Sequence, residues 1–169
     1  MDRGSLLHVG CGNESLPVWM DGFTETRLDI NKASSPDIVA SMLDMGDIGE
    51  YDVIYCSHAL EHLSPFEVPV AISEFLRLLK PGGYAMVFVP DLEDVKATED
   101  VVLESPSGPI TGLDMIYGYA KALREGNHYM AHKCGFVSDT LKNAFINGGF
   151  STVKTQRIVP FNLMAIAIK

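Results

Sequence analysis

Two short apolar runs on either side of one amphipathic helix constrain the fold more than any other feature of the sequence. The runs are "YDVIYC" (51–56) and "YAMVFVP" (84–90), and both are rich in β-branched and aromatic residues, as buried strands are. Between them, apolar residues recur at helical spacing over residues 68–79, and "KPGG" (80–83) ends that pattern. Because parallel strands need a crossover connection of this kind, the pattern predicts a parallel sheet covered on both faces.

The rest of the chain extends this α/β pattern. Further strand candidates lie before and after the central unit, at residues 5–9, 26–30, 36–41, 151–159 and 161–169. Further helix candidates lie at residues 92–105, 112–126 and 136–149. We expect the last two strands, which Pro160 separates, to pair in antiparallel fashion. The predicted fold is α/β and Rossmann-like, a mainly parallel twisted sheet of about seven strands with a C-terminal antiparallel strand pair and helices on both faces.

Length, charge and cysteine content exclude several classes of protein. The 169 residues suit a single domain, 1–169. The formal net charge is −9 and Lys and Arg are not clustered, so we do not expect long nucleic acid as a partner. The three cysteines form no C-x-x-C pair, which favours a reducing compartment. The apolar runs are too short for a membrane span or a signal peptide, so we expect a cytoplasmic protein.

The stretch "HVGCGNES" (8–15) is the first candidate binding site. A strand that runs into Gly10-x-Gly12 lets the backbone approach a ligand closely, because glycine has no Cβ. Asp29 ends the second predicted strand, where a carboxylate can accept the hydroxyl groups of a ribose. Ser15 stands where a dinucleotide motif needs a third glycine, which disfavours NAD and FAD. The pattern indicates a nucleoside site, and the alternative is a simple tight turn beside a solvent-facing Asp.

Five ordered motifs resemble those of one enzyme family. They are "LLHVGCG" (6–12), "RLDI" (27–30), "ASMLDM" (40–45), "YDVIYCSHALEHL" (51–63) and "EFLRLLKPGGYAMVFVPD" (74–91). In this order they resemble the class I S-adenosylmethionine-dependent methyltransferases, in particular the small members similar to methyltransferase type 11. The resemblance implies S-adenosyl-L-methionine as cofactor, S-adenosyl-L-homocysteine as product, and transfer of a methyl group to an acceptor.

The resemblance also implies which residues border the methionine end of the cofactor. Gly10 and Gly12 would border the methionine part, with the Cys11 backbone between them. Cys56 and Ser57, at the end of the fourth strand, would approach the sulfonium.

For the nucleoside end, the resemblance implies four residues. Asp29 would bind the ribose hydroxyls, and Ile30 would pack on the adenine. Asp44 would accept a hydrogen bond from the adenine amino group, with the Met45 backbone beside it. Ile30 and Met45 as plain core residues, and Asp44 as a loop cap, are the alternatives.

The chain departs from the family in the glycine motif, where Glu14 also replaces a third glycine that is often found in the loop. His8 stands two positions before the first glycine, where an acidic residue commonly helps to hold the amino acid part of the cofactor. We keep His8 among the cofactor-binding candidates because of that position. Together with the short segment between the first two strands, this departure motivates a second hypothesis, a non-catalytic module that binds S-adenosylmethionine or a protein partner.

His58, Glu61 and His62 form an H-x-x-E-H pattern, which is also a zinc hydrolase signature. That hypothesis is remote, because Pro65 prevents a long regular helix there. A structural role for the turn is one alternative. The other is catalysis, with His58 as base and with Glu61 and His62 orienting it or holding an ion. The position resembles the E-x-x-E-H site of some metal-assisted O-methyltransferases, although a bound divalent metal is not the favoured hypothesis and its ligands stay unassigned.

The acceptor is expected to be a small molecule or a saccharide, since the charge disfavours nucleic acid. Helices that often precede the first strand and cover the acceptor pocket are not evident. We therefore expect the region 91–135 to supply a lid, or else a homodimer partner or another subunit to cover the pocket. His128 and His132 in this region are further candidates as ligands or pocket residues.

Overall fold

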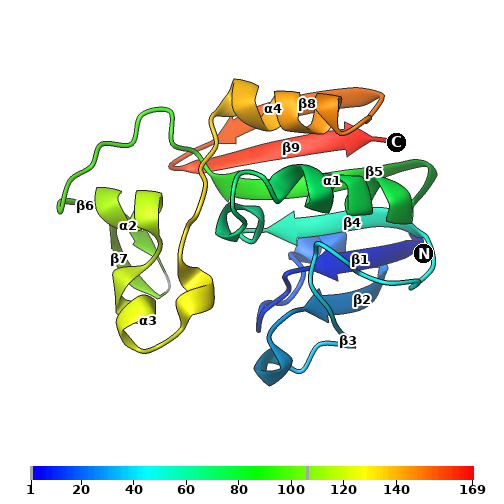
Figure 1. Ribbon diagram of the computed structural model, residues 1–169, viewed down its shortest axis with the longest axis horizontal. Helices are drawn as coiled ribbons and strands as arrows, with labels where there is room; N and C mark the ends of the chain where they lie inside the picture. Colours follow the sequence, from blue (N-terminus) through cyan, green and yellow to red (C-terminus); the bar gives the residue numbers. More distant parts are fainter. Residues whose placement is uncertain (1, 106) are drawn as a thin grey trace.

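A seven-stranded sheet forms the centre of the computed structural model, which describes residues 2–105 and 107–169 (Figure 1). Within these residues the strand order is β3-β2-β1-β4-β5-β9-β8. The strands are β1 (Ser5–Val9), β2 (Thr24–Asp29), β3 (Ile38–Val39), β4 (Tyr51–Ser57), β5 (Leu79–Pro90), β8 (Thr152–Ile158) and β9 (Asn162–Ile168). All pairs are parallel except those that β9 makes with β5 and β8. The predicted fold class, with its C-terminal antiparallel pair, is confirmed.

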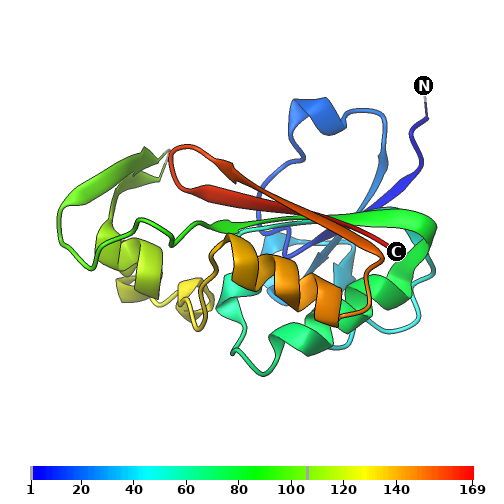
Figure 2. The same ribbon diagram turned by 90° about the horizontal axis from the view of Figure 1, so that it is seen from above.

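Helical cover of the sheet is uneven. The two longest described helices, α1 (Val68–Leu78) and α4 (Ser138–Asn147), lie on the same face of the sheet, as Figure 2 shows from above. There Phe75 of α1 and Phe145 of α4 share one core cluster with strand residues such as Ile54. On the other face the short 3-10 helix η1 (Val18–Met20) contributes Met20 to a smaller cluster. The segment between β1 and β2 contains this 3-10 helix in place of a full crossover helix.

A separate small module lies between β5 and α4, beyond the carboxyl ends of β4 and β5 (Figure 1). It consists of the hairpin β6 (Val101–Ser105) and β7 (Gly108–Thr111), the helices α2 (Gly112–Tyr117) and α3 (Ala120–Arg124), and the 3-10 helix η4 (His128–Met130). Its two ends meet, because the Leu92 amide donates to the Phe136 carbonyl at 3.1 Å. Pro106, which belongs to the loop predicted at 105–109, lies outside the described residues.

Two helix predictions in this module are wrong. Residues 92–105 are not helical, because β6 is held by antiparallel pairing with β7. The helix predicted over 112–126 is broken into α2 and α3 at Gly118, which has a φ of +96°. A Cβ on Gly118 would lie 2.0 Å from the Met130 carbonyl oxygen, so the close approach of another segment requires glycine there.

The remaining short elements are 3-10 helices, η2 (Lys32–Ser34) and η3 (Leu60–His62). In the parts of the chain that the structure describes, no helix is long and apolar enough to cross a membrane.

Candidate functional site

The turn after β1 places two glycines at the carboxyl edge of the sheet. Gly10 and Gly12 have φ values of +66° and +48°, in the left-handed region that favours glycine. A Cβ on Gly10 would lie 2.5 Å from the Cβ of Ala59, so the turn packs directly against the segment after β4. A Cβ on Gly12 would meet no atom within 4 Å, so the backbone there borders open space. A ligand can therefore approach the backbone at Gly12.

Asp29 ties this turn to the end of β2. Its Oδ2 accepts a hydrogen bond from the Gly12 amide at 2.7 Å, and its Oδ1 accepts from the Asn31 amide at 2.7 Å. The residue is buried, with 9% of its surface exposed, so it is not a solvent-facing Asp beside a simple turn. Each carboxylate oxygen retains acceptor capacity for a further donor.

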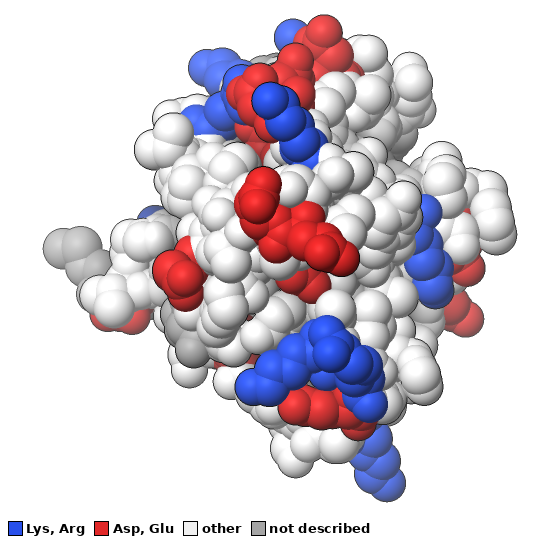
Figure 3. Space-filling model, turned by 90° about the vertical axis from the view of Figure 1, so that its left-hand side faces the viewer, with Lys and Arg blue, Asp and Glu red and all other residues white. Residues whose placement is uncertain are grey.

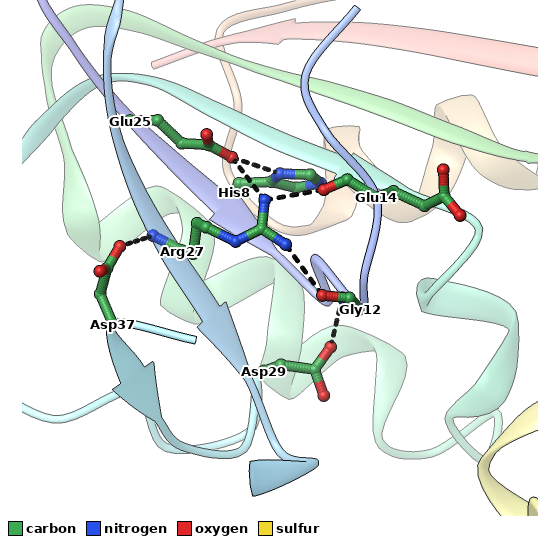
Figure 4. Close-up of polar contacts among 7 residues, drawn as sticks. All are labelled: His8, Gly12, Glu14, Glu25, Arg27, Asp29 and Asp37. Carbon is green, nitrogen blue, oxygen red and sulfur yellow. Dashed lines mark hydrogen bonds and ion pairs between the residues drawn. The ribbon is translucent and has the colours of Figure 1, made fainter. Parts of the chain in front are cut away.

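Arg27 is a residue of this site that the sequence analysis missed. Its guanidinium donates to the carbonyl of Gly12 at 2.8 Å and to that of Glu14 at 2.7 Å, which fixes both sides of the turn (Figure 4). Glu25, on the same face of β2, contacts Arg27 at 3.3 Å and His8 Nδ1 at 2.7 Å. The period-two spacing of charged residues along β2, ending at Asp29, is the signal that indicates this face.

His8 lies beneath the turn in this network. Its side chain is buried, and its ring packs edge-on against Tyr55 on the face with little helical cover. Burial lowers the pKa of His8, so the imidazole is neutral and its Nδ1–H donates to Glu25. The side chain therefore supports the turn through Glu25 and Arg27.

The residues predicted to bind the nucleoside end of the cofactor differ in their exposure to solvent. Ile30 directly follows β2 and is 53% exposed, which leaves an apolar side chain available to a ring. Asp44 is exposed and accepts from the Gly46 amide at 3.3 Å, as a loop cap does. Met45 is buried in the core, and its amide already donates to Glu74 at 2.9 Å. Met42, from the same loop, comes close to Gly10, so this loop borders the glycine turn.

The end of β4 carries the remaining candidates. The side chains of Cys11 and Cys56 are buried, and burial raises the pKa of both thiols, so only their backbones can meet a ligand. Ser57 is partly exposed, and His58 follows with a φ of +51°, unusual for a residue other than glycine. This conformation turns the chain into η3 and leaves the His58 side chain 48% exposed.

Glu61 is the centre of a cluster of histidines. It is 1% exposed, and neither carboxylate oxygen has a hydrogen-bond partner among the described residues. His58 Nδ1 lies 3.5 Å from Glu61 Oε1, and His132 Nε2 lies 4.0 Å from the same oxygen. His62 packs against His132, with ring centroids 5.1 Å apart. The structure therefore brings His58, Glu61 and His62 together with His132, one of the two further histidine candidates, whereas His128 is exposed in η4.

The charges in this cluster are coupled. Desolvation acts to raise the pKa of Glu61, but the neighbouring His58 and His62 outweigh it and hold the pKa below its usual value. Desolvation acts to lower the pKa of His58, but Glu61 outweighs it, and the pKa of His58 is raised. Both shifts favour an imidazolium and a carboxylate. Since 3.5 Å is long for a hydrogen bond, charge attraction carries this pair.

The surface near the module carries charges of both signs and one hollow. Figure 3 views this side of the molecule and shows small groups of charged side chains, most of which contain both basic and acidic residues, with uncharged surface between the groups. A hollow of about 510 Å³ lies between the hairpin turn and α3, and its lining includes Pro109, Tyr119 and Arg124. This hollow belongs to the module, whereas the glycine turn and the histidine cluster lie at the strand ends.

A family model described as a methyltransferase domain matches residues 2–155. The chain belongs to this methyltransferase family. The predicted family is therefore confirmed. A comparison with curated proteins finds no significant match.

Solved methyltransferases share the fold at low sequence identity. An S-adenosylmethionine-dependent methyltransferase of Mesorhizobium loti is 18% identical, with a TM-score of 0.67, over 99% of this chain and 92% of that one. The 1,6-didemethyltoxoflavin-N1-methyltransferase of Burkholderia thailandensis, solved with 1,6-didemethyltoxoflavin and S-adenosylhomocysteine, is 14% identical, with a TM-score of 0.67, over 99% and 72%. Human N-acetylserotonin methyltransferase, solved with S-adenosylmethionine, is 11% identical, with a TM-score of 0.68, over 98% and 47%. This chain spans only 47–51% of the length of three of the solved proteins that it matches.

Proposed function

We propose that this methyltransferase-family domain transfers a methyl group from S-adenosylmethionine to a small-molecule or saccharide acceptor. The observation that carries the proposal is the Gly10–Gly12 turn, bound to Asp29 at the carboxyl edge of the sheet. The turn lies where the strand order reverses, since β1 has β2 on one side and β4 on the other. Open α/β sheets bind ligands at such a point.

In this proposal the cofactor lies along the turn and the end of β2. Gly10, Cys11 and Gly12 would border the methionine part through their backbone, and Asp29 would accept the ribose hydroxyls. His8 would act as a positioning residue, because its buried ring reaches the turn only through neighbouring side chains.

The adenine would lie beyond the ribose, near the loop that follows β3. The exposed side chain of Ile30 would contact the ring, and Asp44 would accept from the amino group. Met45 would hold the loop in place, since its amide already donates to Glu74.

The residues after β4 would serve the transfer itself. When bound, S-adenosylmethionine supplies an electrophilic methyl group on a sulfonium. The backbone at Cys56 and the partly exposed Ser57 would border that end, and alignment of the acceptor would supply most of the rate enhancement. His58 would accept the proton of a hydroxyl acceptor, oriented by the buried Glu61. His62 would hold the turn, since its ring contacts the carbonyls of His58 and Ala131.

The module at 91–135 would cover the acceptor. Its two ends meet at Leu92 and Phe136, and the amides of Lys133 and Cys134 donate to the Glu61 carbonyl at 2.9 and 3.2 Å. The module is therefore attached next to the proposed transfer site. A second subunit over the same edge is the alternative source of cover.

Calorimetry with S-adenosylhomocysteine tests the proposal. We expect micromolar binding by the wild-type domain and binding at least about tenfold weaker in Asp29→Asn, since a charge-assisted hydrogen bond to ribose is worth more than about 1.4 kcal/mol. Asp21→Asn, an exposed carboxylate after η1, is the matched control and should bind as the wild type does. Absence of wild-type binding at millimolar ligand would sink the proposal.

The second candidate, a non-catalytic binding module, is favoured by the buried His8 at a position where the family commonly has an acidic residue. Release of S-adenosylhomocysteine during incubation with a panel of phenols, amines and sugars separates the two. Turnover that falls by more than a few-fold in a His58→Ala, His62→Ala double variant supports catalysis. Binding without turnover on any acceptor supports the module.

A further inference from the structure

We propose that Glu61, His62 and His132 bind a first-row divalent metal ion such as Zn²⁺. One ligand atom from each of these residues lies within 4.8 Å of the others. The first two residues belong to η3, directly after β4, and the third comes from the end of the module. The inference concerns metal binding alone and does not depend on methyl transfer.

Glu61 is the first indication of a cation. Its carboxylate is 1% exposed, and among the described residues neither oxygen accepts a hydrogen bond. A buried carboxylate without hydrogen bonds is costly unless a cation compensates it. The nearest group able to carry a positive charge is the half-exposed ring of His58 at 3.5 Å, and at that distance it leaves the acceptor capacity of both oxygens unused.

His132 presents an unprotonated nitrogen to this carboxylate. Its Nδ1 lies 2.9 Å from the Met115 carbonyl, which can only accept, so Nδ1 carries the proton. In the neutral ring, Nε2 then directs a lone pair toward Glu61 Oε1, 4.0 Å away. Two lone pairs that face each other at a buried site indicate a cation between them. An imidazole that donates one nitrogen to a carbonyl and offers the other is the usual arrangement of a metal-binding histidine.

His62 can also offer one ring nitrogen to an ion. Its Nδ1 lies 3.0 Å from the Ala131 carbonyl, and its Nε2 lies 3.2 Å from the His58 carbonyl. An imidazole binds a metal ion in its neutral form, which has one N–H, so only one of these carbonyls can then receive a proton. The other nitrogen is free to bind a metal if the ring turns slightly toward Glu61.

The backbone holds these side chains close before any ion binds. The amides of Lys133 and Cys134 donate to the Glu61 carbonyl, and the His132 amide donates to the Tyr117 carbonyl at 3.1 Å. The Cys134 thiol lies 3.7 Å from the carbonyl oxygens of Leu60 and of Glu61, and it is not one of the three grouped ligands.

The donor set selects the class of ion. Two imidazoles and one carboxylate suit Zn²⁺ and its first-row neighbours, whereas Mg²⁺ and Ca²⁺ prefer all-oxygen sites. Ligand atoms of a tetrahedral Zn²⁺ lie about 3.4 Å apart, given metal–ligand bonds of about 2.1 Å. Glu61, His62 and His132 must therefore draw together on binding, and a fourth position stays open for water or another ligand.

Metal titration of the chelator-treated protein, without cofactor or acceptor, tests this proposal. We expect calorimetry with ZnCl₂ to give one ion per chain at micromolar affinity and MgCl₂ to give no binding at the same concentrations. Co²⁺ should give the intense visible absorption bands of a tetrahedral site with nitrogen ligands. Glu61→Gln and His132→Gln should each weaken Zn²⁺ binding by about tenfold or more.

His128→Gln is the matched control, because His128 is an exposed histidine of the same module, four residues before His132. It should bind Zn²⁺ as the wild type does. The proposal is overturned if the wild type binds no Zn²⁺ at micromolar concentration, if His128→Gln weakens binding as much as His132→Gln, or if the Co²⁺ spectrum is that of a six-coordinate oxygen site. The Co²⁺ spectrum is recorded on the wild-type protein, so the test still gives an answer if a variant fails to fold. Loss of methyl transfer alone has no bearing on it.

Discussion

At the scale of single residues, Gly10 and Gly12 share one turn but differ in their surroundings. Alanine at either position meets a left-handed φ, which costs about 1–2 kcal/mol. At Gly10 the new Cβ would also lie 2.5 Å from the Cβ of Ala59, and overpacking adds about 1–3 kcal/mol. We expect Gly10→Ala to lower the free energy of unfolding clearly more than Gly12→Ala does, as urea denaturation would measure. Equal losses would mean that the turn does not pack on Ala59.

Residues of the site could be predicted from the sequence where a motif fixes them along the chain. The glycine turn and Asp29 do lie together, because each ends a strand and parallel strands bring their carboxyl ends to one edge. Arg27 was not predicted, and His132 was predicted only as one of two candidate ligands or pocket residues in the region 91–135. The role of Arg27 depends on the carbonyls of Gly12 and Glu14, and His132 meets Glu61 only because the module returns to η3. The period-two spacing along β2 indicates only the face that carries Arg27, and no spacing in the sequence predicts either of these contacts.

At the scale of elements, the amino ends of β1, β4 and β5 are joined by one carboxylate. Asp52 Oδ2 accepts from the Ser5 amide at 2.7 Å and from Lys80 Nζ at 2.8 Å. The hydrogen bonds with Lys80 and Ser5 lower the pKa of Asp52 from 3.8 to about 2. Because the folded pKa lies below the unfolded one, this stabilisation is present above pH 3.8 and is lost as the pH falls toward 2.

The prediction is that Asp52→Asn removes this pH dependence. The difference in unfolding free energy between wild type and variant should be largest at pH 5 and should shrink as the pH falls toward 2. Asp52 is 39% exposed, so solvent screens the pair and we expect less than about 1 kcal/mol. Urea denaturation at several pH values measures the difference, with Asp21→Asn as the control. A difference that does not change with pH would contradict the proposed ion pair.

Elements with a strong apolar signal could be predicted, and those held only by pairing could not. The strands at 5–9 and 51–56 are confirmed to within a residue, because each is buried in the middle of the sheet. The segment at 92–105 has the charged composition of a surface helix, but β6 forms there through its pairing with β7. Similarly, Gly118 breaks a helical pattern because Met130 packs against it.

At the scale of the whole molecule, the two faces of the sheet are packed to different degrees. On β9, Ala165 is fully buried and faces the core with α1 and α4, whereas the neighbouring Met164 points to the other face and is partly exposed. We expect Ala165→Leu to destabilise the domain by about 1–3 kcal/mol through overpacking. For a domain of this size, each kcal/mol lowers Tm by about 2–4 °C.

Met164→Leu is the matched control, a substitution of similar volume on the same strand. Its effect on Tm in a thermal melt should be smaller than that of Ala165→Leu. If the two variants lose the same stability, the core is not concentrated on the face that carries α1 and α4.

The place of β9 also dictates an order of folding events. It follows β8 along the chain but lies between β5 and β8 in the sheet, since residues 162–168 pair with β5 on one side and with β8 on the other. During synthesis, β8 is therefore complete before the strand that must separate it from β5 exists. Until β9 emerges, β5 presents an open edge of unpaired amide and carbonyl groups, and β8 has no partner in the sheet. Pairing of β9 with β5 and β8 is consequently a long-range step that follows synthesis of both strands. Until then, the open β5 edge is a site where a nascent chain can pair with another chain.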